Sequence, residues 1–321
     1  MPALITHALM GENVLENLAH AQTYSHNERR AFLLGTQGPD PYFFRFSNLH
    51  ATPAHHLAKN LHYYKIAEQF YSYYDALLYL DEADKPLGKA YLLGFLTHYS
   101  LDSLAHPFIY AQQAELIQAS PDLSLAAREL HSAIESDIDT SMLMHMHQYE
   151  VSHAYILSLL KAPREVIEIA GLLHAYVARN VYSLDIHEDE FKHSLADMRA
   201  IYHLVEDESS SHAQLASKLE QLIRKKSILG ALAHRSQSDK TDLALNLEHH
   251  AWKDPYHRHT SHESFIDIFA KASEAFQKNC QVFLQGGPME DISKHTNYYG
   301  QPLDESELFT LVENEDEKSW E

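Results

Sequence analysis

Hydrophobic side chains recur every three to four positions along most of this sequence, with polar residues between them. This spacing is typical of amphipathic helices, and we find no convincing run with the two-residue alternation of a half-buried strand. The pattern predicts helices at 7–22, 26–35, 53–80, 86–106, 122–147, 149–160, 163–183, 188–206, 210–233 and 261–284. No internal repeat or linker divides them, so we expect a single, multi-helical, all-α domain.

The helical pattern fades after Gly286, where the chain becomes acidic. We therefore expect residues 1–285 to form the helical domain and residues 286–321 to form an acidic C-terminal extension.

The most apolar predicted helix carries three polar side chains on one face. His98, Asp102 and His106 are spaced four residues apart in GFLTHYSLDSLAHPF (94–108). At 3.6 residues per turn, such positions drift only about 80° around the helix over the whole series. Polar groups buried there need partners or a metal ion, because an unpaired buried charge is very costly. Pro107 disfavours helical geometry in the preceding residue, which predicts that this helix ends at His106.

A second pair, His131 and Glu135, has the same four-residue spacing on the predicted helix 122–147. Two helices that each present ligands in this way can hold adjacent metal ions between them, as helix bundles do. The pair also has a simpler interpretation as part of a solvated helix face. The chain contains 25 histidines, so a histidine followed four residues later by an acidic residue also arises by chance.

The composition narrows the chemistry. The 321 residues include 45 Asp and Glu but only 25 Lys and Arg, which gives a formal net charge of −20. This acidity argues against a protein that holds duplex nucleic acid through counterion release. A single cysteine, Cys280, excludes an internal disulfide and a thiolate-built zinc site. Imidazole and carboxylate remain as the available metal ligands.

Taken in order, several segments resemble the zinc-dependent phospholipase C family. They are the start MPALITH, the loop GTQGPDPYFF, the helix LAKNLHYYK, the GFLTHYSLDSLAHPF stretch with its later His-x-x-x-Glu, and LNLEHHAWKDPYHRHTSHESF. Each segment is a weak signal alone, whereas their order is specific and spans residues 1–285. The resemblance implies the all-helical fold that this family shares with single-strand-specific zinc nucleases.

The resemblance also implies a cluster of two to three Zn²⁺ ions. One ion would be held by Asp40, His62, His98 and Asp102. A second would be held by His106, His131 and Glu135, and a third by His7 with Asp102 as a bridge. Secreted members of the family complete the third site with an amino-terminal tryptophan that is not seen here. The third site therefore has the fewest ligands. Asp40 would additionally be the catalytic residue that orients or deprotonates the attacking water.

The activity implied is hydrolysis of glycerophospholipids, at a membrane surface, to diacylglycerol and a phosphorylated headgroup. The aromatic residues Tyr42, Phe43 and Phe44 after Asp40 are candidates for headgroup binding, with simple core packing as the alternative. Pro41 stands where the best-studied members have an aromatic residue, which leaves a choline preference open. Two other functions stay open: a zinc nuclease or other phosphodiesterase, and a histidine-rich metal-binding protein without catalysis.

The sequence shows no recognisable targeting signal. The start lacks the features of a secretory signal peptide, and no run of 18 apolar residues predicts a transmembrane helix. We expect a cytoplasmic protein by default and leave export by a non-classical route open. No feature indicates an oligomeric state.

Overall fold

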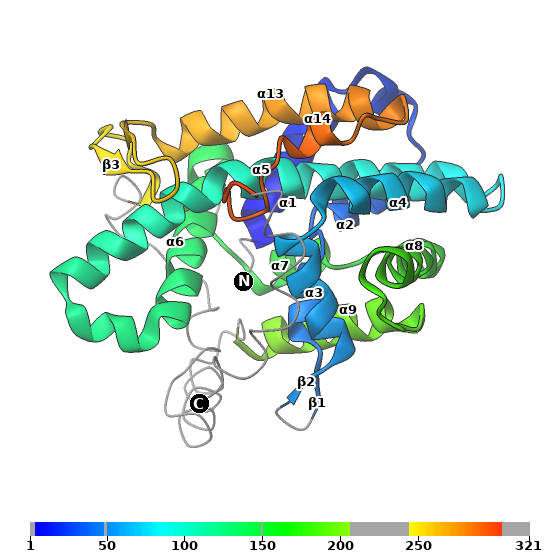
Figure 1. Cartoon of the computed structure of the whole chain (residues 1–321), viewed down its shortest axis with the longest axis horizontal. Coiled ribbons are helices and arrows are strands. Elements are labelled where there is room, and N and C mark those ends of the chain that lie inside the picture. Colours follow the sequence, from blue (N-terminus) through cyan, green and yellow to red (C-terminus); the bar gives the residue numbers. More distant parts are fainter. Residues whose placement is uncertain (1–3, 48–49, 149, 206–243, 304–321) are drawn as a thin grey trace.

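The computed structural model describes residues 4–47, 50–148, 150–205 and 244–303, and helices dominate this part of the chain (Figure 1). The α-helices are α1 (Leu4–Asn17), α2 (His26–Gly35), α3 (Pro53–Tyr63), α4 (Ile66–Tyr79), α5 (Lys85–Ala119), α6 (Ala127–His147), α7 (His153–Leu159), α8 (Arg164–Tyr182), α9 (Asp189–Val205), α13 (Phe265–Leu284) and α14 (Glu290–Ser293). Three 3-10 helices are η1 (Ala19–Thr23), η2 (Asp40–Phe44) and η3 (Pro121–Ala126). The all-α fold predicted from the sequence is confirmed.

Strand structure in the described residues is limited to two short antiparallel pairs. β1 (Phe46–Ser47) pairs with β2 (His50–Ala51), and β3 (Trp252–Lys253) pairs with β4 (Thr260–Ser261). None of the described helices combines the length and hydrophobicity that crossing a bilayer requires.

The 35-residue helix α5 is the axis of the fold. Figure 1 shows α13 running alongside it, with α8 and α9 on its opposite side. Its most extensive contacts are with α2 and α13, and it also contacts α1, α6 and α8. Most of its residues from Ala90 to Ala111 are buried, so this segment is surrounded by other helices and has no wide polar face.

Two glycines bring the backbones of α2 and α5 into contact. A Cβ atom at Gly94 would collide with the carbonyl oxygen of Phe32, and one at Gly35 would collide with that of Tyr91. A third glycine, Gly38, has a φ of +55°, and a Cβ there would collide with the imidazole of His98. Glycine is therefore required at this crossing, which sets the position of His98 relative to the loop that leads into η2.

The predicted helix 53–80 is wrong as a single element, because α3 and α4 are separated at Lys65. Lys65 adopts the left-handed conformation, with φ 54° and ψ 47°. The end of α8 supplies the contacts that stabilise this break: the Tyr182 hydroxyl donates to the Tyr64 carbonyl at 2.8 Å, and Lys65 Nζ donates to the Val181 carbonyl at 3.1 Å. These partners lie more than a hundred residues away, so helical periodicity alone could not predict the break.

The prediction that a helix ends at His106 is also wrong, since α5 continues through Pro107 to Ala119. Proline removes one helical hydrogen bond. The hydrophobic face nevertheless continues beyond it with Phe108 and Ile109, both buried, and ending the helix would expose them. Pro107 is itself buried and packs against Gly300, whose added Cβ would lie 2.5 Å from Pro107 Cγ.

Two further predicted helices are 261–284 and 210–233. The helix expected from residue 261 begins at Phe265, because Ser264 and Asp267 form a reciprocal capping box there. The predicted helix 210–233 lies outside the described residues.

We expect Gly94→Ala to lower the free energy of unfolding by about 3 kcal/mol, because the added methyl group forces the α2 and α5 backbones apart. Gly88→Ala on the same helix is the matched control. Its Cβ would meet only the side-chain ends of Leu80, Leu77 and Ile169, which can move aside. Urea unfolding of both variants is the measurement, and equal destabilisation would contradict the proposed role of the crossing.

Candidate metal centre

Eight buried side chains converge from α1, η2, α3, α5 and α6. They are the eight residues that the sequence singles out: His7, Asp40, His62, His98, Asp102, His106, His131 and Glu135. His131 is the most exposed of them, at 8%. The structure therefore brings every predicted ligand into one cluster of imidazoles and carboxylates, which we call the metal centre.

Asp102 lies in the middle of the centre. Its Oδ2 atom is 3.1 Å from His98 Nε2 and 3.9 Å from His62 Nε2. Its Oδ1 atom is 3.2 Å from His7 Nε2 and 3.7 Å from His106 Nδ1. The four-residue spacing on α5 places this carboxylate between His98 and His106, and α1 and α3 bring His7 and His62 to it.

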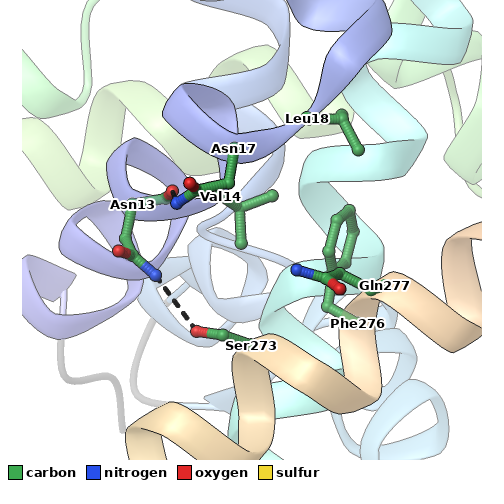
Figure 2. A pocket seen from close by; sticks show the side chains of 7 residues that line it. All are labelled: Asn13, Val14, Asn17, Leu18, Ser273, Phe276 and Gln277. Atoms are coloured by element: carbon green, nitrogen blue, oxygen red, sulfur yellow. Dashed lines mark hydrogen bonds between the residues drawn. The ribbon is translucent and has the colours of Figure 1, made fainter.

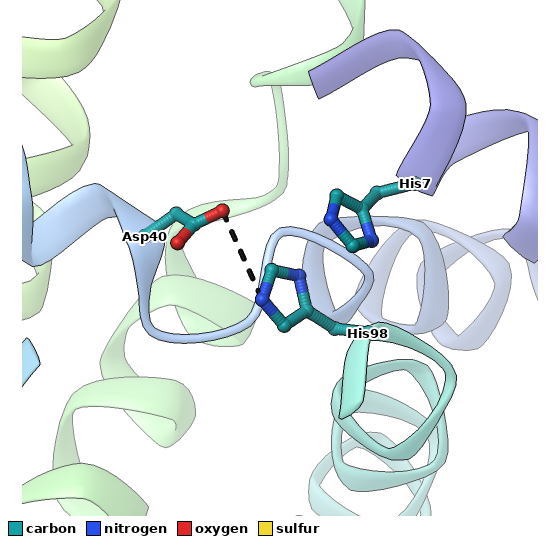
Figure 3. A group of neighbouring side chains, drawn as sticks. All are labelled: His7, Asp40 and His98. Carbon is teal, nitrogen blue, oxygen red and sulfur yellow. Dashed lines mark ion pairs between the residues drawn. The ribbon is translucent and has the colours of Figure 1, made fainter. Parts of the chain in front are cut away.

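Asp40 approaches from the other side, at the first residue of η2. Its Oδ1 atom is 3.2 Å from His62 Nε2, and its Oδ2 atom is 3.8 Å from His98 Nε2. Figure 3 shows Asp40, His7 and His98 pointing toward one another from η2, α1 and α5. The rings of His7 and His98 are stacked, with centroids 4.0 Å apart.

The remaining three residues form a compact group between α5 and α6. Glu135 Oε1 lies 3.2 Å from His131 Nε2 and 3.7 Å from His106 Nε2. The two imidazole rings are stacked, with centroids 5.5 Å apart and an interplanar angle of 12°. The four-residue pair on α6 therefore faces the centre, and its interpretation as a solvated face does not hold.

Three sets of side chains could each hold an ion, because the ligand atoms within each set lie within 4.8 Å of one another. They are His7–Asp40–His98, His62–His98–Asp102 and His106–His131–Glu135. We call the set of His106, His131 and Glu135 the second group. Its members are those that the family resemblance implies. The other two sets share His98, and we call them together the first group. In this group the geometry places Asp40 with His7, whereas the family resemblance assigns these two residues to different ions.

Hydrogen bonds orient most of the imidazoles. Nδ1 of His62, His98 and His106 lies 2.7, 3.0 and 3.1 Å from the backbone carbonyl oxygens of Ala58, Thr36 and Asp102, respectively. His131 Nδ1 lies 3.2 Å from Gln113 Oε1. We assign the proton to Nδ1 in each case, which directs an unprotonated Nε2 into the centre. Metal-binding histidines are typically held in this way.

Two completely buried ring nitrogens of the centre have no hydrogen-bond partner in the described part of the chain. His7 Nδ1 is one, and His98 Nε2 is the other, although it lies 3.1 Å from an oxygen of Asp102. A buried polar atom without a hydrogen bond costs about 1–3 kcal/mol. The unbonded Nε2 atom of His98, which faces the carboxylates of Asp102 and Asp40, fits a centre organised around a cation.

The protonation states also fit metal binding. Burial would raise the pKa of Asp102, but the surrounding His98, His106 and His7 hold it well below its usual value. Burial lowers the pKa of His106 to about 4, so this imidazole is neutral at pH 7. Glu135 keeps a pKa of about 2 despite burial, with His131 among the groups that lower it. Ionised carboxylates and neutral imidazoles are the forms that bind metal ions.

His7 is the exception in this electrostatic arrangement. Burial would lower its pKa, but the charge of Asp102 and the hydrogen bond to it raise the pKa above the usual value. A proton on His7 therefore competes with a metal ion for the same side chain, and this competition strengthens as the pH falls.

Four half-buried tyrosines border the second group, and we call them the tyrosine rim: Tyr63, Tyr110, Tyr256 and Tyr299. The Tyr299 ring lies 4.9 Å from that of His106 and 4.5 Å from that of Tyr63. The Tyr110 ring lies 5.1 Å from that of His131 and 6.3 Å from that of Tyr256. The sequence prediction missed these residues. Tyr110 could have been found, since it extends the four-residue series of His98, Asp102 and His106.

Residues 294–303, within the predicted acidic extension, cover the first group. The backbone N–H of Tyr298 donates to the His62 carbonyl at 3.1 Å, and the Tyr298 ring is completely buried, 5.0 Å from that of His62. The hydroxyl of Tyr99 donates to the carbonyl of Thr296 at 2.9 Å. This part of the chain therefore contributes directly to the surroundings of the metal centre.

The aromatic residues after Asp40 divide between core and centre. Tyr42 and Phe44 are each 1% exposed and pack against residues of α8 and α9, so core packing applies to them. Only Phe43 is half-buried near the centre, with its ring 5.0 Å from that of His62. Of the three aromatic residues that the sequence offers as headgroup contacts, only Phe43 lies beside the centre.

A small cavity elsewhere has a different character. It lies between α1 and α13, has a volume of about 80 Å³ and is lined by Asn13, Val14, Asn17, Leu18, Ser273, Phe276 and Gln277 (Figure 2). It contains no titratable side chain and is too small for a phosphodiester substrate.

Comparisons of this chain with protein-family models, curated proteins and solved structures find no match.

We expect the purified protein to bind two to three Zn²⁺ per chain, and Asp102→Asn to bind at least one fewer because an amide cannot replace the shared carboxylate. Metal analysis after gel filtration measures both. Asp254→Asn is the matched control, since this carboxylate lies 3.0 Å from His257 Nδ1 but outside the centre. Equal zinc content in wild type and Asp102→Asn would contradict the metal centre.

Proposed function

We propose that this chain is a zinc-dependent phosphodiester hydrolase of the phospholipase C type. The observation that carries the proposal is the convergence of five histidines and three carboxylates, without a thiolate, in one buried centre. Nitrogen and oxygen ligands leave zinc strongly Lewis-acidic, as in hydrolytic sites. The resemblance of the sequence motifs to the zinc-dependent phospholipase C family adds the class of substrate.

Bound Zn²⁺ would lower the pKa of a water molecule to about 7 and offset the negative charge of the phosphate. First-group residues Asp40, His62, His98, Asp102 and His7 would hold one or two ions. Second-group residues His106, His131 and Glu135 would hold another, and three protein ligands leave coordination positions for water and substrate.

Asp40 has the position required of a proton acceptor. It lies at the start of η2 and not within a long helix, and its two oxygens face His62 and His98 on different elements. A carboxylate there can take the proton of an attacking water or orient that water by accepting a hydrogen bond. Asp40 is only 3% exposed, and this burial keeps competing bulk water away.

The tyrosine rim is the proposed contact surface for the part of the substrate beyond the phosphate. Tyr299 and Tyr110 lie directly beside His106 and His131, and the aromatic faces of the rim can pack against a lipid headgroup or glycerol backbone. Burial raises the pKa of Tyr110 and Tyr299, so both phenols stay protonated and can donate hydrogen bonds to phosphate oxygens.

A zinc nuclease is the second candidate, because aromatic rings beside a phosphodiester site can also stack on the bases of a single strand. The net charge of −20 disfavours a polyanionic substrate. The third candidate, a non-catalytic metal-binding protein, would rely on histidines outside the centre, such as His153 and His203, whose ring nitrogens lie 2.8 Å apart.

We expect zinc-loaded protein to release phosphorylated headgroup from phospholipid vesicles, and Asp40→Asn to lower kcat by at least about 100-fold, since general base catalysis contributes that much. Single-stranded DNA and a generic phosphodiester complete the substrate panel. Asp122→Asn, an exposed carboxylate outside the centre, is the control. Cleavage of DNA without cleavage of lipid would favour the nuclease, and zinc binding without any hydrolysis would favour the metal-binding protein.

We expect Tyr299→Ala to raise KM for the lipid substrate several-fold while the zinc content stays at the wild-type value, because the ring borders the ligands without supplying a ligand atom. Tyr79→Ala is the matched control, since Tyr79 is 76% exposed at the end of α4. Kinetics at several vesicle concentrations, with metal analysis of the same samples, provide the measurement. A wild-type KM for Tyr299→Ala would remove the rim from the substrate site.

A further inference from the structure

The face of α6 that carries His131 and Glu135 continues one turn further to Asp139. These three residues have the same four-residue spacing, and Asp139 is only 1% exposed. It is not among the predicted metal ligands, and it does not belong to any of the three sets of ligand atoms described above. A carboxylate so deeply buried requires a specific role.

The partners of Asp139 are at the start of α1, more than 130 residues earlier. Its Oδ2 accepts from the backbone N–H of Ile5 at 2.9 Å. Its Oδ1 accepts from the backbone N–H of Thr6 at 2.7 Å and from the Thr6 hydroxyl at 2.5 Å. The first N–H groups of a helix have no acceptor within the helix, and a negative charge there is also favoured by the helix dipole. Asp139 therefore acts as an N-terminal cap for α1 supplied by another helix.

The capped residues directly precede His7. His7 Nε2 lies 3.2 Å from Asp102 Oδ1, and its ring stacks on His98, so a small shift of α1 would move it out of the first group. The helix that holds α1 in place is the same helix that supplies His131 and Glu135 to the second group. One face of α6 thus contacts both groups, directly at one end and through α1 at the other.

We infer that Asp139 is a positioning residue of the metal centre, which fixes His7 of the first group relative to His131 and Glu135 of the second. The inference rests on the proposed zinc centre. Asp139 acts through the backbone of α1 and touches no ion or substrate. It differs from a purely structural cap because its loss changes one part of the centre and leaves the other intact.

Asp139→Asn tests this role. The amide keeps the size of the side chain. Its NH₂ group, however, would lie against a backbone N–H group of α1 that donates to the carboxylate in the wild type. We expect zinc affinity of the first group to fall about 10- to 100-fold, the usual effect of removing a residue that orients ligands. The second group should keep its ion. Cobalt substitution distinguishes the two by their absorption bands, independently of catalytic activity.

Asp137→Asn is the matched control, because it makes the same change on the same helix at an exposed position two residues away. Thr6→Val is a milder test, removing only the hydroxyl bond, and covers the case in which Asp139→Asn does not fold. We expect a smaller loss of affinity at the same group. Circular dichroism and thermal unfolding of the metal-free proteins check the fold.

The outcomes separate this inference from the proposed function. If wild type binds zinc and both Asp139→Asn and Thr6→Val bind it with wild-type affinity and the same cobalt spectrum, Asp139 is not a positioning residue. Equal losses from both groups would also overturn the inference, since that is the result of general destabilisation. Wild-type protein that binds no zinc or cobalt would contradict the proposed function together with this inference.

Discussion

The structure depends on the burial of one carboxylate, Asp102, in the most apolar helix of the chain. A charge at that depth is tolerated only if opposite or polar groups surround it. Imidazoles from α1, α3 and α5 do so, and their approach determines where those helices must lie. The glycine crossing of α2 and α5 serves the same arrangement, because it places Gly38 and the Thr36 carbonyl against the His98 ring.

The candidate metal centre is assembled from side chains that are individually held in place. Four of the five imidazoles have Nδ1 beside a carbonyl or amide oxygen, and this leaves Nε2 directed toward the carboxylates. Nδ1 of His7 has no such bond within the described residues, and its position depends on the placement of α1 as a whole. The contacts of Asp139 with the first turn of α1 therefore matter more for His7 than a local hydrogen bond does for the other imidazoles.

The aromatic surroundings of the centre differ from those that the sequence suggests. The three aromatic residues that follow Asp40 do not line it together, since two of them pack into the core beside α8 and α9. Tyrosines from α3, α5, the β3–β4 loop and residues 294–303 border it instead. The proposed substrate contacts thus come from segments far apart in the sequence, gathered around side chains that the sequence had already singled out.

The sequence by itself determined the helical fold class and the ligand-bearing faces, because four-residue spacing of His98, Asp102 and His106 has only one geometric meaning on a helix. It also identified all eight side chains of the centre, through spacing for five of them and through family resemblance for His7, Asp40 and His62. Only the tertiary structure decided that α5 continues past Pro107, that the chain breaks at Lys65, and that Tyr299 and Asp139 adjoin the centre. Each of these depends on partners distant in sequence, whereas periodicity reports only which side of a helix is buried.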